Sequence, residues 1–472
     1  MVFSSVFFLF FFLPIFLAIY YITPTKHRSW IILLGSYAFY AWWRVDFLAL
    51  FIGVTLWNYL FGIHIARAKY CRNAKQARAK KLLLIAVMGN LLTLGYFKYA
   101  DFGIKNFNLM LDQLGASPLP LADIILPIGI SFYTFQAISY VVDVYRGDSP
   151  PTRKLVDFAA FIALFPQLIA GPVLRYKDIA DQFESRQHNF QIFSEGVVLF
   201  MIGFAKKVLI ADSVAPIADA AFQASNVSFL DAWLGAIAYS IQLYFDFSGY
   251  SDMACGLGLM MGFRFIKNFD HPYVSLSITE FWRRWHISLS TWLRDYLYIP
   301  LGGNRNGKLG TYRNLFLTML LGGLWHGANW TFVFWGALHG TALAIEKMLS
   351  ATNPLSLKLP RYLITMFIVV IGWVAFRAED LSVAIVFYES MFGFAQYHSD
   401  ASALSDVSLR AFAFLLIALA IIVVENIKRH QWSAAKLPVM HFARPLLLVP
   451  VFVLAVSKLV ASSYSPFLYF QF

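Results

Sequence analysis

Long apolar runs separated by short polar loops constrain the fold of this chain more than any other feature. With 59% hydrophobic and 14% charged residues among 472, it is too apolar for a soluble domain of this length. The sequence therefore predicts an all-α polytopic membrane protein, a single domain over residues 1–472 with about ten to twelve membrane helices. Where Gly or Pro interrupts a run, we expect re-entrant elements. The runs cover about 5–22, 30–62 (two short runs), 82–100, 121–142, 155–172, 190–211, 229–248, 311–329, 331–349, 361–377, 408–425 and 443–461.

The placement of positive charge predicts the topology. Residues 64–81 carry seven Lys and Arg and no acidic residue, so this loop is expected to stay in the cytoplasm. Three runs precede it, which predicts an N-terminus outside. The first run follows no Lys or Arg and no cleavage site follows it, so we expect a retained membrane helix rather than a signal peptide. The basic loop is too short for a nucleic-acid-binding face.

A polar segment over residues 263–313 interrupts the membrane pattern and is rich in Arg and Lys, which predicts a cytoplasmic location. Residues 279–295 are expected to form one amphipathic helix with Thr279 as its N-cap. Its tryptophans suit a membrane interface. Alternatively, its arginines line a funnel that binds a phosphate-bearing donor such as coenzyme A, with His286 in the same funnel. The candidate donor-binding residues are Arg283, Arg284 and Arg294, followed by Asn304 and Arg305 at the tip of a Gly-Gly turn.

His326 lies inside an otherwise apolar stretch, between the runs 315–321 and 331–338. An imidazole at such a depth is costly unless it faces a protein interior or a water-filled cavity. There it either hydrogen-bonds between packed helices or exchanges protons near neutral pH. Both alternatives remain open from the spacing alone.

Other polar residues in apolar surroundings are candidates for a tunnel or for structural pairing: Asp246, Asp252, Asn329 and His339. Intramembrane carboxylates usually pair with other polar groups, and that structural role is favoured here. Glycines between 322 and 340 are expected to let neighbouring helices approach closely. Cys71 and Cys255 lack metal-ligand spacing, so no metal site is predicted.

Several ordered segments together resemble the membrane-bound O-acyltransferase (MBOAT) family and, within it, the bacterial alginate O-acetyltransferase branch. The similarity extends from end to end of the chain, which makes it specific. The matching segments are residues 1–5, 36–43, 126–136, 166–172, 244–252, 279–305, 325–328 and 465–472.

The resemblance implies a helical bundle around a central tunnel in the bacterial inner membrane. It implies that His326 is the family's near-invariant histidine and His286 a second functional one. It also implies transfer of an acetyl group from a cytoplasmic thioester, acetyl-CoA or another acetyl thioester, to an exported polysaccharide. Alginate is the first candidate, followed by cellulose or peptidoglycan. No bound cofactor is expected. A periplasmic partner of the SGNH-hydrolase type is expected.

The expected chemistry centres on His326 as a general base for an acceptor hydroxyl, with a covalent acetyl-histidine as the variant. Asn329, Trp330 or a backbone amide would stabilise the oxyanion. In the aromatic tail, Tyr469 is a candidate acyl carrier, although an interfacial anchor explains the same composition. Two rival functions are a polysaccharide or lipid-linked sugar transporter and a lipid or protein acyltransferase. The transporter is disfavoured because the chain shows no internal repeat.

Overall fold

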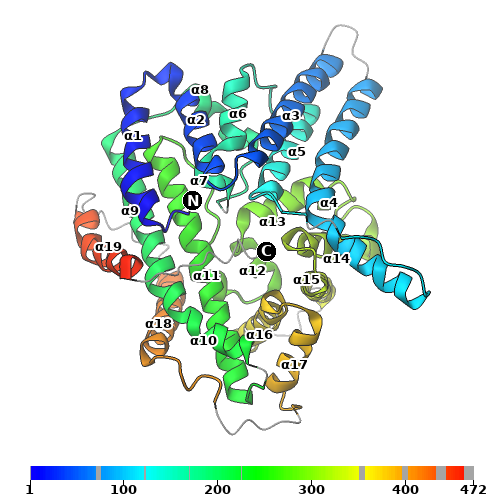
Figure 1. The fold of residues 1–472 in the computed structure, drawn as a ribbon, viewed down its shortest axis with the longest axis vertical. Coiled ribbons are helices and arrows are strands. Elements are labelled where there is room, and N and C mark those ends of the chain that lie inside the picture. The colour runs from blue at the N-terminus through cyan, green and yellow to red at the C-terminus, as the bar shows by residue number, and fades with distance from the viewer. Residues whose placement is uncertain are drawn as a thin grey trace. The chain divides into compact units, whose positions relative to one another are not determined.

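The computed structural model describes residues 2–70, 76–121, 124–169, 171–224, 226–349, 357–395, 402–431 and 443–461. Every regular element in these ranges is helical, which confirms the predicted all-α class (Figure 1). Among them, four helices are long and apolar enough to cross a membrane. They are α3 (Asp46–Tyr70), α4 (Gln76–Gln113), α16 (Lys358–Arg377) and the Leu409–Asn426 part of α18.

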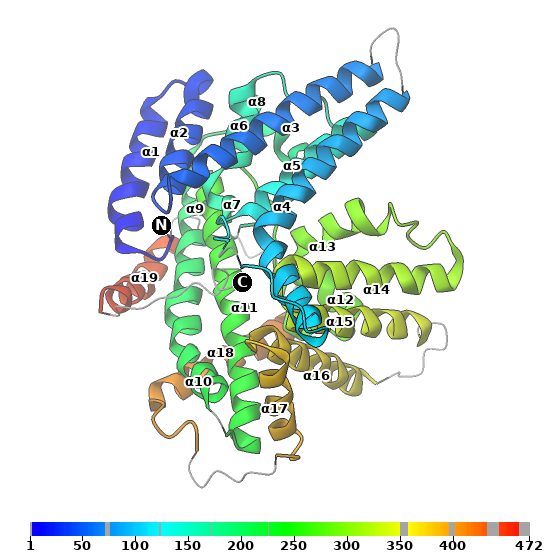
Figure 2. The same cartoon turned by 45° about the vertical axis from the view of Figure 1, so that its right-hand side comes forward.

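The chain forms two compact units. Unit 1 contains the residues up to Gly196 together with Ala254–Ile266. In Figure 2, α3 and α4 form a long hairpin in this unit, and the paired amides of Asn58 and Asn90 join them at 2.7 and 2.9 Å. Pairing removes the cost of burying two amides among apolar side chains. The other helices of unit 1 are η1 (Phe8–Phe12), α1 (Leu13–Ile22), η2 (Thr25–His27), α2 (Arg28–Ala41), α5 (Ile130–Arg146), α6 (Leu155–Ala163), α7 (Phe165–Leu168), α8 (Tyr176–Glu184) and the first part of α9 (Phe190–Ala205).

Unit 2 contains Val197–Met253 and the residues from Lys267 onward. The helix α11 (Phe229–Met260) belongs to this unit as far as Met253. The remaining helices of unit 2 are the end of α9, η3 (Lys206–Ala211), α10 (Asp212–Gln223), η4 (Pro272–Val274), α12 (Ile278–Arg284), α13 (Ile287–Leu293), η5 (Arg294–Tyr298), α14 (Gly307–His326), α15 (Trp330–Leu349), α16, α17 (Leu381–Met391), α18 (Leu409–Gln431) and α19 (Ala443–Ala461).

The helix break expected near residues 165–172 is present. Helix α6 ends at Ala163, and α7 is a single turn with Pro166 at its second position. Proline at that position costs no hydrogen bond, because the first amides of a helix have no intrahelical acceptor. The amide of Phe165 donates instead to the Ser36 hydroxyl at 3.1 Å, which ties the break to α2.

Helices α14 and α15 pack at unusually short range, as the glycines predicted (Figure 2). A Cβ on Gly323 would lie 2.3 Å from the Phe332 carbonyl oxygen, and one on Gly336 would lie 2.6 Å from that of Met319. Backbone therefore meets backbone at both positions, and neither can carry a side chain without separating the helices.

Two consecutive lysines in the π-helical η3 neutralise the carboxylates of α11. Lys207, which is 1% exposed, pairs with Asp246 at 2.8 Å and also with Asp212. Lys206 pairs with Asp252 at 2.7 Å. Asp246 and Asp252 are thus paired, as expected for carboxylates in apolar surroundings. Their partners are two lysines inside an apolar run.

The prediction of one amphipathic helix over residues 279–295 is wrong. The structure contains α12 and α13, separated at Trp285 and His286, followed by the π-helical η5. The N-cap is Ser277, whose hydroxyl accepts the Glu280 amide, and not Thr279. The supposed interfacial face is buried in unit 2: Trp282, Trp285, Leu289 and Trp292 are each less than 9% exposed. Helical spacing correctly detected a face but could not tell a lipid interface from a protein core.

The close contact between α14 and α15 predicts the effect of a single methyl group. Gly336→Ala should destabilise the chain by about 1–3 kcal/mol, because the new Cβ meets backbone that cannot rotate away. Gly95→Ala in α4 is the matched control, since no atom lies within 4 Å of its Cβ position. Thermal unfolding in detergent should show a lower Tm for Gly336→Ala and an unchanged or higher Tm for Gly95→Ala. Equal Tm values for the two variants would contradict the close approach.

Candidate active site

His326 ends α14 and is 8% exposed in unit 2. Its imidazole lies edge-on to three aromatic rings, with centroid distances of 5.1 Å to Trp325, 5.2 Å to Trp335 and 5.1 Å to Phe376. The next residue must be glycine, because a Cβ on Gly327 would lie 2.0 Å from the Phe332 ring. The turn between α14 and α15 thus holds the histidine inside an aromatic cage.

His326 opens onto a narrow cavity with space of about 10 Å³, the size of a single water molecule. It is the one titratable side chain among the seven that line this cavity. The indole N–H of Trp335, on the same wall, is buried and donates to no acceptor in the described part of the chain. The cavity therefore brings together an imidazole, which can accept and donate a proton, and an indole N–H that is free to donate a hydrogen bond. Its lining is Leu243, Phe247, Trp285, His326, Trp335, Trp373 and Phe376.

His286 lies between α12 and α13 with φ 44° and ψ 54°, the left-handed region that side chains rarely adopt. The ring is fully buried, and its Nδ1 lies 3.1 Å from the Asn268 side-chain oxygen. That oxygen can only accept, so Nδ1 carries the proton and Nε2 is left as an acceptor. Nε2 contacts no donor among the described residues. The site thus contains a second imidazole with one fixed tautomer.

The two histidines are connected through aromatic rings. His286 packs edge-on against Phe247 at 4.8 Å, and Phe247 lines the cavity of His326. Trp325 contacts both imidazoles, at 6.3 Å from His286 and 5.1 Å from His326. His286 therefore supports the wall of the cavity rather than lining it.

His339 in α15 is buried on the same aromatic cluster. Its ring lies 4.9 Å from that of Trp335 and 5.3 Å from that of Trp282. Neither ring nitrogen has a hydrogen-bond partner within the described ranges. His326 and His339 belong to different helices and are thirteen residues apart in the sequence. Both rings nevertheless pack against the ring of Trp335.

The candidate donor-binding residues differ in how far their charges are neutralised. Arg284 pairs with Glu280 at 3.1 Å and with Asp270 at 3.2 Å, and Arg294 pairs with Asp295 at 2.7 Å. Arg283, Asn304 and Arg305 are exposed, and no ion pair engages the two arginines in the part of the chain that the structure describes. The turn before Arg305 is held by Asn314, whose amide donates to the carbonyls of Leu301 and Gly303.

Of the remaining candidates, those with a described position are not among the side chains that line the cavity. The Asn329 side-chain NH₂ donates to the Glu379 carbonyl at 2.6 Å, and its side-chain oxygen accepts the backbone N–H of Thr331 in the first turn of α15. Trp330, the first residue of α15, is half exposed. Asp246 lies on α11 between Leu243 and Phe247, so its ion pair fixes the helix that forms one cavity wall. Tyr469 lies outside the described residues. No three His, Cys, Asp or Glu side chains of the described residues come together to hold a metal ion.

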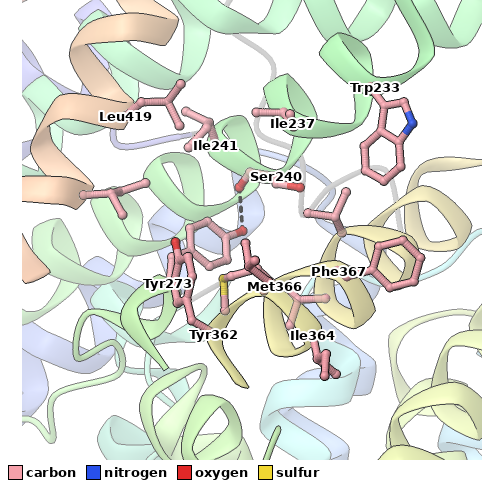
Figure 3. A pocket seen from close by; sticks show the side chains of 14 residues that line it. Trp233, Ile237, Ser240, Ile241, Tyr273, Tyr362, Ile364, Met366, Phe367 and Leu419 are labelled. Atoms are coloured by element: carbon pink, nitrogen blue, oxygen red, sulfur yellow. Dashed lines mark hydrogen bonds between the residues drawn. The ribbon is translucent and has the colours of Figure 1, made fainter. Parts of the chain in front are cut away.

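A larger cavity of about 630 Å³ lies elsewhere in unit 2, between α11, α16 and α18 (Figure 3). Its size suits a ligand, but its walls are almost entirely apolar, with Trp233, Phe367 and Leu419 among them. The Tyr273 hydroxyl at its edge is already committed, donating to the Ser240 carbonyl at 2.6 Å. With no histidine or carboxylate in its lining, this cavity offers no proton-transfer group, and the His326 cavity is the better candidate active site.

Asn268 and the two lysines of η3 are the structural contributors that the sequence analysis missed. Asn268 lies in an irregular segment, where no periodicity marks a residue that contacts another eighteen positions away. Lys206 and Lys207 did carry a signal, since lysine inside an apolar run is rare and calls for a nearby acid.

Comparisons with known proteins identify the family of the chain. The family model of the membrane-bound O-acyltransferases matches residues 152–387, which include both His286 and His326. Three relatives, of decreasing similarity, were compared with the chain. It is 54% identical to a protein of Pseudomonas putida named as a probable alginate O-acetylase, over the whole of both chains. It is 39% identical to a peptidoglycan O-acetyltransferase of Helicobacter pylori, over 83% of this chain and 80% of the relative.

The third relative is a teichoic acid D-alanyltransferase of Streptococcus thermophilus, which is 30% identical over 46% of this chain and 56% of its own length. All three names describe acyl transfer, and none describes transport. The family model and the full-length match therefore show that the chain is an acyltransferase that belongs to the membrane-bound O-acyltransferase family.

Proposed function

We propose that this chain moves an acetyl group from a cytoplasmic thioester to an exported polysaccharide, with alginate as the first candidate. The observation that carries the proposal is the 54% identity, without truncation of either chain, to a protein named for alginate O-acetylation. Peptidoglycan is the second candidate, because the relative named for its acetylation is less similar, at 39%. Cellulose remains a third.

The distribution of Lys and Arg along the chain and the charge of the donor both support a location in the inner membrane. We infer a bacterial inner-membrane protein with its N-terminus outside, its basic loop 64–81 in the cytoplasm and ten to twelve membrane helices around a tunnel. A charged acetyl-CoA, or another acetyl thioester, cannot cross about 30 Å of hydrocarbon. A tunnel that admits the thioester from one side and an acceptor from the other avoids that crossing. A periplasmic SGNH-hydrolase-type acetyltransferase is the expected partner.

In the proposed reaction, His326 takes the proton of an acceptor hydroxyl as its oxygen attacks the thioester carbonyl. The carbon–sulfur bond then breaks, and the leaving thiolate takes the proton from the imidazolium. The indole N–H groups of Trp335 and Trp373 are both buried, unpartnered within the described residues and part of the cavity lining, and we favour Trp335 as the oxyanion donor because its ring packs against His326 at 5.2 Å. The Asn329 amide is a poorer candidate, since the Glu379 carbonyl already engages it.

Donor binding requires the cavity to widen, because a space for one water molecule does not accommodate an acetyl thioester. Phosphate groups of the donor would contact Arg283 and Arg305, whose charges are exposed, in preference to Arg284, which two carboxylates already engage. His286 acts as a positioning residue that holds Phe247 and Trp325.

Removing the proposed base should abolish transfer without unfolding the chain. His326→Ala is expected to lower acetylation at least 10²-fold, because a positioned general base contributes about 10²–10⁴-fold. Ester-linked acetyl can be measured by NMR on alginate, cellulose and peptidoglycan from cells in which this chain is the sole acetylation route. His64→Ala is the control, since that histidine is exposed in α3. Native acetylation in His326→Ala would overturn the assignment.

At position 286, the backbone and the imidazole can be tested separately. His286→Asn and His286→Ala both lose a buried ring and should be less stable than the native chain. His286→Asn should nevertheless unfold with a free energy about 1–2 kcal/mol higher than His286→Ala, because asparagine tolerates the left-handed conformation. Both variants lose the ring that packs on Phe247, so both should lose activity. An active His286→Asn would show that only the backbone turn matters.

The acyl-carrier hypothesis for Tyr469 predicts protein-bound label. Purified chain incubated with acetyl-CoA labelled in the acetyl group should retain label, and Tyr469→Phe should lose that label while still binding the donor. His326→Ala should lose both thioester cleavage and label. If Tyr469→Phe transfers acetyl at the native rate, the tail is an anchor and the acceptor hydroxyl attacks the thioester directly.

A further inference from the structure

Two arginines in unit 1, the buried Arg28 and the partly buried Arg186, have guanidinium groups that form no ion pair with an acidic side chain of the described residues. Arg28 begins α2 and is 8% exposed, with its guanidinium carbon 5.0 Å from the centroid of the Tyr20 ring. Its Nε donates to the Thr23 carbonyl at 3.1 Å. Its Nη1 is buried and has no hydrogen-bond partner among the residues that the structure describes.

Arg186 approaches the same place from the loop after α8. Its guanidinium carbon lies 4.5 Å from the centroid of the Phe263 ring, and its Nη1 is also buried with no acceptor in the described ranges. Asp157 acts on Arg186 electrostatically, but no ion pair joins the two side chains. A buried guanidinium without a carboxylate is costly, so an anion from outside the chain would stabilise this arrangement.

The two arginines converge on the hydroxyl of Tyr20. This hydroxyl donates to the Met261 carbonyl at 2.7 Å and lies 2.9 Å from His188 Nε2, and both guanidinium groups interact with it electrostatically. Burial, together with the charges of Arg28 and Arg186, lowers the pKa of His188, which lies in the loop between α8 and α9. His188 therefore adds no positive charge of its own beside the two arginines.

We propose that Arg28 and Arg186 form a binding site for a phosphate ester. A guanidinium presents a planar set of N–H donors that matches the oxygens of a phosphate. Two guanidinium groups around the Tyr20 hydroxyl provide more donors than one carboxylate could accept. The site lies where α1 ends at Ile22, beside the partly exposed Tyr21. Tyrosine at a helix end is typical of the membrane interface, at the depth of lipid headgroups.

An anionic phospholipid is thus one source of the phosphate, and a soluble compound such as coenzyme A is the other. The site shares no residue with the His326 cavity, and its test does not depend on acetyl transfer. The Tm of the purified full-length chain is measured in nanodiscs of phosphatidylcholine, with and without phosphatidylglycerol, and in neutral detergent during titration with coenzyme A. Ligands that bind the folded state raise the Tm with concentration, which yields an apparent affinity.

At least one phosphate source should stabilise the native chain, and Arg28→Gln and Arg186→Gln should each weaken that effect about tenfold or more. Lys26→Gln is the matched control, an exposed cation two residues from Arg28, and should respond like the native chain. Arg28→Lys keeps the positive charge but lacks the planar set of N–H donors. This variant should therefore bind the phosphate source with intermediate affinity. If Arg28→Gln does not fold, Arg186→Gln carries the test.

Stabilisation by phosphatidylglycerol alone assigns the site to a lipid, and stabilisation by coenzyme A alone assigns it to a soluble phosphate ester. The proposal is overturned if neither source stabilises the native chain, or if both glutamine variants respond as the native chain does.

Discussion

The contact of α14 with α15 is the constraint on which the candidate active site depends. Because glycines let the two backbones touch, the turn between them is short and brings the end of α14 directly against the start of α15. His326 is the last residue of one helix, and Trp335 lies in the second turn of the other. Separating the helices by the width of a side chain would open the aromatic cage and release the imidazole.

Buried polar groups of the described residues differ in how far their hydrogen-bonding capacity is used. Some are paired, as with the amides of Asn58 and Asn90 and the ion pair of Lys207 with Asp246, whereas others are not, among them Nη1 of Arg28 and of Arg186. Groups near the cavity keep unused hydrogen-bonding capacity, as with Nε2 of His286 and the indole N–H of Trp335. Unused capacity in an apolar interior is costly, and sites that act on substrates are where that cost is most often found.

The sequence predicted the helical class and the approximate position of most of the longer helices, but not of α8, α10 or α17, because only a long apolar run in a membrane protein has few alternatives to a helix. It also identified His326, since a lone histidine among apolar residues is conspicuous. It failed over residues 279–295, where spacing alone could not show that the chain turns at His286 or that Trp282 and Trp285 are buried. The role of Asn268 depends on a contact across an irregular segment, which no local pattern reports.

The π-helical segment η3 restricts which insertions and deletions this part of the chain tolerates. A π-helical turn holds one residue more than an α-helical turn, so it behaves as a single inserted residue. Loss of one residue from Lys206–Ala211 would rotate the flanking parts of the helix by about 100° relative to each other. The lysines could then no longer both face the carboxylates of α11. Single-residue deletions in η3 should therefore be rarer among homologous sequences than substitutions there, because a deletion breaks both ion pairs at once.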